Sequence, residues 1–262
     1  MTSEGTKVVI VGDVKQEDIV PKLAFLNQLP NKKITVPKPE AAPPIDKTKV
    51  YLVDVPKAAQ TEFRVGYATG LTYDATGDYY KASLANYPLG GDFNSRLNLN
   101  LREDKGWTYG ASSSFQATAY NGNYIFSSGI RADASDSALS ETMREITAYA
   151  ADGIKDEELV FMRNALGQRD ALSYETPIQK AGYIRRVLDY NLPANYVAQQ
   201  NKILMNITKQ EINAIAKRRL DPSKMNILLV GDKARIYDGV KKLGYEIVEL
   251  DADGNKVTKK GF

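Results

Sequence analysis

Histidine and cysteine are both absent from the 262 residues of this sequence. Without cysteine the chain has no disulfide, no thiolate nucleophile and no thiolate zinc site. Without histidine it has no histidine-based zinc site either, and only carboxylates remain as metal ligands. The acidic residues 103–104 and 156–158 fall at the ends of predicted helices, where carboxylates are ordinarily solvated caps. The sequence therefore predicts that this chain binds no metal.

A strong excess of charge and a long apolar run are also missing. The 35 basic and 32 acidic residues leave a net charge of +3, and no long basic run gathers that charge into a footprint for nucleic acid or an anionic membrane. No stretch approaches the roughly 18 apolar residues of a membrane span, and the opening MTSEGTK lacks the hydrophobic region of a secretory signal. We expect a soluble, unprocessed chain without nucleic-acid or membrane partners; its localisation stays open.

A short pattern occurs twice and suggests how the chain divides. KVVIVGD at residues 7–13 and MNILLVGD at residues 225–232 each read as a buried strand, a tight glycine turn and an amphipathic helix. Between them, residues 31–46 are rich in proline and predict an extended linker. We interpret residues 1–30 as the closing strand–helix unit of a preceding related domain, and residues 47–262 as the domain that follows. Alternatively, the first unit packs as an extra layer on that domain.

Hydrophobic periodicity predicts the elements of the main domain. Strands are expected at 49–56 and 60–69, a helix at 78–88, and a second helix after Gly90 and Gly91 on which Phe93, Leu97 and Leu101 recur every four residues. From Trp107 to residue 119, alternate residues share one face of a strand, and a turn at residues 121–122 leads into its hairpin partner.

Helical periodicity then takes over until the end of the domain. Helices are expected from residue 133 to a stop at Gly153, then at 155–173, 176–190, 193–205 and 208–219, before a closing strand, helix and strand at 225–250. Strands followed by a run of helices predict an α+β fold, with a mixed or antiparallel sheet and helices layered on one face.

Arg102 and Tyr109 are the candidate functional side chains. They are expected at the end of one helix and the start of the next strand, where a loop at residues 104–106 would bring them to one groove. A guanidinium offers always-charged donors to peptide carbonyls, and a phenol can donate to an oxygen that becomes negative in a transition state. The plain alternative is a solvated arginine at a helix end and a tyrosine used for packing.

The surrounding sequence favours the functional interpretation. LGG at residues 89–91, SRL at 95–97, LRE at 101–103 and KGWTYG at 105–110 resemble the signature segment of the C-terminal domain in the insulinase and pitrilysin family of zinc peptidases. The similarity extends from about residue 49 to residue 249. The resemblance implies the fold of that family, which includes mitochondrial processing peptidase. It also implies two homologous domains facing each other across a cleft.

In that family the N-terminal domain carries H-x-x-E-H and a distant glutamate, and its partner supplies an arginine and a tyrosine that hold the substrate. By resemblance, Arg102 and Tyr109 occupy those two positions. Because the chain has no histidine, the resemblance implies that zinc and the general-base glutamate come from a partner domain or subunit, and that this chain alone is inactive. The alternatives are a scaffold homologue that has lost peptide cleavage and an independent peptide-binding module.

Overall fold

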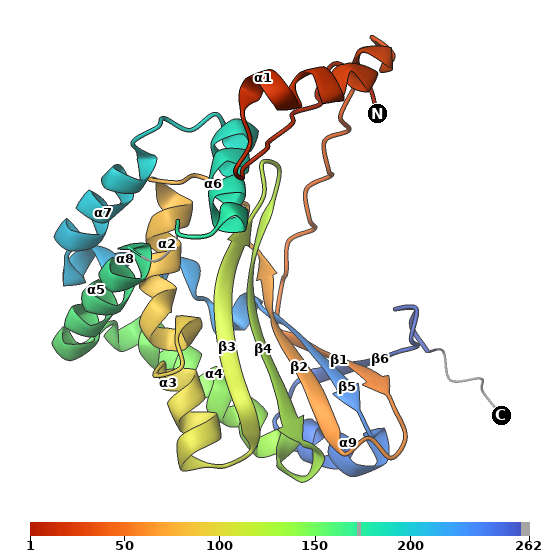
Figure 1. The fold of residues 1–262 in the computed structure, drawn as a ribbon. Coiled ribbons are helices and arrows are strands. Elements are labelled where there is room, and N and C mark those ends of the chain that lie inside the picture. The colour runs from red at the N-terminus through yellow and green to blue at the C-terminus, as the bar shows by residue number, and fades with distance from the viewer. Residues whose placement is uncertain (172–173, 258–262) are drawn as a thin grey trace.

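The core of the molecule is one mixed six-stranded sheet (Figure 1). The computed structural model describes residues 1–171 and 174–257. The strand order is β3-β4-β2-β5-β1-β6. The strands are β1 Lys49–Asp54, β2 Gln60–Ala68, β3 Thr108–Ala117, β4 Gly122–Arg131, β5 Asn226–Gly231 and β6 Glu246–Leu250.

Pairing within the sheet is antiparallel on one side and parallel on the other. β3, β4, β2 and β5 are successively antiparallel, whereas β1 is parallel to both β5 and β6. Alternate residues of β2, β4 and β5 are buried against the helices, and the residues between them are less buried. This period of two is that of a sheet covered on one face. The predicted α+β fold with helices layered on one face is therefore confirmed.

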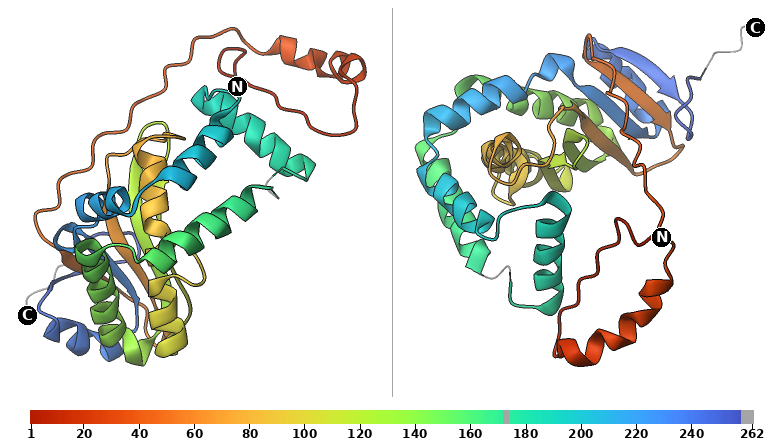
Figure 2. Two further views of the ribbon diagram at one scale, coloured as in Figure 1. Left: turned by 90° about the vertical axis from the view of Figure 1, so that its left-hand side faces the viewer. Right: turned by 90° about the horizontal axis from the view of Figure 1, so that it is seen from above.

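The helices pack on the buried face of the sheet (Figures 1 and 2). They are α2 Asp78–Asn86, α3 Arg96–Asn98, α4 Ser135–Asp152, α5 Asp156–Ala171, α6 Pro177–Tyr190, α7 Tyr196–Asn206, α8 Lys209–Arg219 and α9 Lys233–Lys242. α4 ends where predicted, because Gly153 adopts a φ of 76° that ends the helix without a Cβ penalty. Residues 172–173 of the helix predicted at 155–173 lie outside the described residues. No described helix is long and apolar enough to cross a bilayer.

The strand predicted at residues 7–13 is wrong in this structure. Residues 7–13 form neither strand nor helix, and only a short helix α1 Gln16–Ile19 and a 3₁₀ segment η1 Pro21–Gln28 follow. A strand is stabilised by hydrogen bonds to a neighbouring strand, and no strand of this sheet lies beside these residues. No residue in 1–49 is buried, so the segment adds no layer to the sheet. It extends beside α6, where the Lys7 ammonium donates to the Leu188 carbonyl (Figure 1).

Candidate functional site

Arg102 lies on a π-helical turn, η3 Leu99–Asp104, at the end of the segment that begins with α3. Its guanidinium lies over the ring of Phe93, 4.3 Å from the centroid, and its Nη1 donates to the Glu103 carboxylate. The Arg102 side chain keeps 32% of its surface exposed. The guanidinium is therefore held in place yet remains accessible to a ligand.

Phe93 is a residue whose role the periodicity misassigned. The predicted helix placed it with Leu97 and Leu101 on one buried face. Leu97 and Leu101 are fully buried as expected, but Phe93 is 59% exposed. The helix begins only at Arg96, because residues 92–95 form a turn in which the Asp92 carboxylate accepts from the Asn94 amide. Phe93 thus lies outside the helix and is available to Arg102.

Tyr109 projects from a β-bulge at the start of β3. Thr108 pairs with Ile130 and Ala111 with Ser128, so Tyr109 and Gly110 together oppose a single residue of β4. A bulge of this kind inserts one extra residue and redirects the side chains that precede it. Tyr109 is 90% exposed. The single face predicted for Trp107, Tyr109 and Ala111 is therefore wrong, since the alternation reverses at the bulge.

Hydroxyl groups stabilise this bulge. The Thr108 and Ser128 hydroxyls both donate to the Gly110 carbonyl at 2.9 Å. Behind it, the Trp107 amide donates to the Leu101 carbonyl at 3.0 Å and the Gly106 amide to the Arg102 carbonyl at 3.1 Å. These bonds tie the end of η3 to the start of β3. Arg102 and Tyr109 therefore belong to one tightly connected turn, although no hydrogen bond joins their side chains in the described structure.

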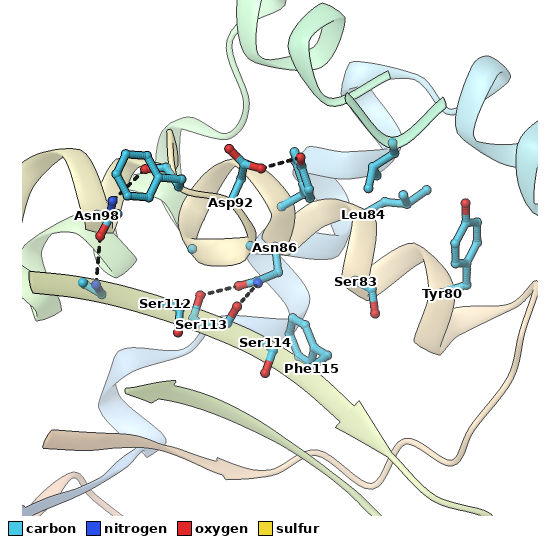
Figure 3. A pocket seen from close by; sticks show the side chains of 17 residues that line it. Tyr80, Ser83, Leu84, Asn86, Asp92, Asn98, Ser112, Ser113, Ser114 and Phe115 are labelled. Carbon is cyan, nitrogen blue, oxygen red and sulfur yellow. Dashed lines mark hydrogen bonds between the residues drawn. The ribbon is translucent and has the colours of Figure 1, made fainter. Parts of the chain in front are cut away.

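A cleft of about 720 Å³ opens beside this turn (Figure 3). Neither Arg102 nor Tyr109 is among the residues that line it, but Phe93, which contacts Arg102, and Gly110, which follows Tyr109, both do. Tyr80 and Leu166 also line it, together with the outer edge of β3. The cleft thus extends away from the candidate pair, between α2 and the edge strand of the sheet. It has the size and mixed lining of a ligand site.

Two asparagines occupy part of the β3 edge (Figure 3). Asn98 Oδ1 accepts from the Ala111 amide at 2.9 Å, and Asn86 Nδ2 donates to the Ser113 carbonyl at 2.7 Å. The Ser113 hydroxyl returns a bond to Asn86 Oδ1 at 2.7 Å. These side chains replace the backbone groups of an added strand. A peptide cannot add to the sheet at Ala111 and Ser113 unless it displaces them.

Each of those asparagines is followed by a π-helical segment: η2 Tyr87–Gly91 comes directly after Asn86, and η3 comes directly after Asn98. Such segments are rare and often occur at functional sites. Gly90 of η2 packs so closely on β3 that a Cβ would lie 2.6 Å from the Ser113 amide nitrogen. The tight turn expected at Gly90 and Gly91 is thus a close approach of two backbones. Nothing in the hydrophobic period distinguishes π from α helix, so the sequence did not reveal these segments.

Arg96 anchors the segment that carries Arg102. Its guanidinium donates to both Glu158 oxygens, at 2.6 and 2.7 Å, and to the Gly153 carbonyl at 2.9 Å. It also lies over the Tyr149 ring, 4.9 Å from the centroid. Burial opposes the ionisation of Glu158, but its hydrogen bonds to Arg96 and to the Lys155 amide outweigh burial and lower the pKa of the carboxyl. α3 is therefore fixed against α4 and α5.

The described residues contain no group of three or more histidine, cysteine or acidic side chains arranged to hold a metal ion. The donor set that the resemblance assigns to zinc does not exist in this sequence, which has no histidine. The residues present therefore do not fit a zinc site, and the site has the chemistry of a binding surface: a guanidinium, a phenol and an aromatic ring beside a cleft.

Comparison with known families identifies one match. Residues 1–166 match the family model described as the peptidase M16 inactive domain. No curated protein matches the chain.

Solved structures share the fold. The peptidase M16 inactive domain from Pseudomonas fluorescens superposes with a TM-score of 0.70 at 24% identity, over 84% of this chain and 52% of that chain. A protease from Helicobacter pylori has a TM-score of 0.70 at 15% identity, over 84% of this chain and 53% of that chain. A predicted insulinase family protease from Yersinia pestis has a TM-score of 0.65 at 16% identity, over 88% of this chain and 53% of that chain. This chain thus spans about half the length of each of these structures.

Proposed function

This chain belongs to the peptidase M16 inactive-domain family, and we propose that it is the substrate-binding half of a zinc peptidase that hydrolyses peptides. It is an inactive C-terminal domain of the insulinase type. The observation that carries the proposal is the accessible pair on one connected turn: Arg102 is held by Phe93, Tyr109 projects from a bulge, and their neighbours Phe93 and Gly110 line a cleft.

Arg102 and Tyr109 have complementary roles in this proposal. Arg102 donates to a backbone carbonyl of an extended peptide, because its charge is permanent and its ring contact with Phe93 restricts its position. Tyr109 donates its hydroxyl to the carbonyl oxygen of the scissile bond as that oxygen becomes negative.

The remaining chemistry belongs to a partner. A homologous domain or subunit with H-x-x-E-H would hold zinc, which polarises the carbonyl and activates water, and would provide the general-base glutamate. This chain then binds and orients the peptide, and it faces the zinc-binding domain across the peptide. A partner is needed because this sequence has no histidine.

The N-terminal segment points to where that partner docks. Val8 and Ile10 occupy the positions of Ile227 and Leu229 in the repeated pattern; the latter two are fully buried in β5, whereas Val8 and Ile10 are 49% and 42% exposed. We propose that residues 1–30 belong to the end of the preceding related domain, with residues 31–46 as the linker. Amide hydrogen exchange at residues 7–13 should slow when the zinc domain is added. Unchanged exchange in an active mixture would contradict this placement.

Peptide hydrolysis by separate and mixed components tests the function. This chain, a chain carrying H-x-x-E-H and their mixture are each assayed with a fluorogenic peptide, with zinc and after chelation. We expect cleavage only in the zinc-loaded mixture. Silence in a folded, zinc-loaded mixture would instead favour a scaffold homologue, or a peptide-binding module if the chain alone still binds peptide. Cleavage by this chain alone would overturn the proposal.

A further inference from the structure

A second hollow of about 540 Å³ adjoins the cleft at its far end. Tyr80 and Leu166 line both cavities, so the two meet at these side chains. The second hollow lies between α6 and α7, which stand together at one end of the helical layer (Figure 2). A groove therefore extends from the turn that carries Arg102 and Tyr109 to the tyrosine-rich surface of α6.

The walls of this hollow are aromatic and ordered. The ring of Tyr183 stacks on that of Tyr196, with centroids 5.4 Å apart and planes inclined by 13°, and it meets Tyr174 edge-on at 5.1 Å. The Tyr183 hydroxyl donates to the Ala194 carbonyl at 2.9 Å, which fixes α6 to the start of α7. Tyr196 is buried. The rings thus form a fixed wall with one apolar and one polar side.

Arg186 supplies the charge. Its side chain lines the hollow. Among the described residues no carboxylate forms an ion pair with Arg186, whereas Arg185, its neighbour on α6, is paired with Asp189 at 3.3 Å. A guanidinium has five N–H donors, so most of those on Arg186 remain available. A planar fork of donors against aromatic rings is suited to a carboxylate.

We propose that the hollow around Arg186 binds a carboxylate of the peptide, either its C-terminal group or an acidic side chain. The assignment rests on the proposed function, because it extends the peptide path beyond Arg102 and Tyr109. Charge complementarity selects the occupant: the rings contact apolar atoms of the peptide, and Arg186 pairs with the carboxylate. The site would then favour peptides that carry a negative group at a fixed distance from the bond that is cut.

Equilibrium binding to this chain alone tests the assignment, since it needs neither zinc nor a partner. Three peptides of one neutral sequence, each labelled with an uncharged BODIPY dye, are compared by anisotropy: one with a free C-terminus, one amidated, and one amidated with an internal glutamate. We expect at least one carboxylate peptide to bind about 10-fold tighter than the neutral amide, as a charged hydrogen bond allows. The peptide that gains affinity identifies the source of the carboxylate. Equal affinity of all three would overturn the proposal.

Variants on one helix provide the control. Arg186→Gln should abolish the preference, Arg186→Lys should keep part of it, and Arg185→Gln, which removes the same charge from the same helix, should leave it unchanged. Preference retained in Arg186→Gln would contradict the assignment even if the peptide still binds. Hydrolysis by the zinc-loaded mixture is measured in parallel. If the mixture cleaves peptides but this chain shows no preference for a carboxylate, only the Arg186 site is refuted. If this chain shows the preference but the mixture does not cleave peptides, only the peptidase function is refuted.

Discussion

The guanidinium of Arg102 lies 4.3 Å from the centroid of the Phe93 ring, and both side chains remain partly exposed beside the cleft. A cation above an aromatic face is stabilised by the ring quadrupole, and the contact restricts a long, flexible side chain. Because Phe93 precedes α3 and Arg102 follows it, the contact joins the two ends of this segment. In the proposed function, this contact pre-organises the charged donor for a peptide.

Removing either member of this contact should affect substrate binding more than turnover. In the reconstituted enzyme, Arg102→Ala should raise KM by about 10-fold with kcat less affected, since a charged hydrogen bond to the substrate is lost. Phe93→Ala should raise KM by a smaller factor because the guanidinium remains but is less ordered. Arg144→Ala, which removes an exposed arginine from α4, is the matched control. Unaltered kinetics in a stable Arg102→Ala protein would show that Arg102 does not bind the substrate and is a solvated arginine at the end of a helix.

Tyr109 is expected to act on the chemical step. Tyr109→Phe removes only a hydroxyl from a side chain that is 90% exposed, so folding should be intact. If the hydroxyl stabilises the oxyanion, kcat should fall by roughly 10- to 1000-fold. Tyr120→Phe, on the exposed loop between β3 and β4, controls for loss of a phenol. An unchanged rate in Tyr109→Phe would remove the catalytic assignment while leaving the binding role open.

Much of the fold could be predicted because its signals are local. The hairpin of β3 and β4 shows the alternation of a half-buried sheet, and α4 shows an apolar stripe ending at a glycine that requires positive φ. The strand predicted at residues 7–13 failed for a non-local reason. Its pattern matches that of β5, but β5 lies between β2 and β1, whereas no strand in the described part of the chain pairs with residues 7–13.

The site could be predicted less completely. The family resemblance of the surrounding sequence selects Arg102 and Tyr109, and the structure places them on either side of the expected loop, in η3 and at the start of β3; their roles in catalysis remain predictions. The bulge at Tyr109 was not foreseen, because an extra residue in a strand depends on its pairing with β4 and leaves no signal in the alternation itself. The roles of Asn86 and Asn98 were also missed, since hydrogen bonds between segments far apart in sequence follow from the tertiary fold.

Gly90 and Gly167 allow a matched test of packing beside the cleft. A Cβ on Gly90 would lie 2.6 Å from the Ser113 amide nitrogen, whereas a Cβ on Gly167 meets nothing within 4 Å. Gly90→Ala should therefore lower the free energy of unfolding by about 1–3 kcal/mol or more, because backbone has to move. Gly167→Ala, inside α5, should raise it by about 1 kcal/mol through helix propensity. Urea unfolding of both variants measures the difference. Equal stability would show that η2 is not tightly packed on β3.

Acid should weaken the anchor between Arg96 and Glu158. Burial works against ionisation of Glu158, yet bonds from Arg96 and the Lys155 amide hold its folded-state pKa below the ordinary value of 4.5. A depressed folded-state pKa adds stability that is fully present above the unfolded-state pKa and is lost as pH falls through the folded-state value. The free energy of unfolding should therefore decline below about pH 4.5. The Glu158→Gln variant should be less stable than the parent at pH 7, but its free energy of unfolding should fall less on acidification.

Thermal unfolding measured from pH 7 to pH 3 separates the effect of this ion pair from the destabilisation caused by protonation of the other carboxylates. Glu157→Gln makes the same charge change at the adjacent, exposed position and should follow the parent protein. At pH 7 the Glu158→Gln substitution should lower the free energy of unfolding by about 2 kcal/mol, because it removes a charged hydrogen-bonding partner from a partly buried arginine. Parallel curves for Glu158→Gln and the parent would contradict the lowered pKa. They would also show that α3 is fixed mainly by Leu97 and Leu101, which are fully buried.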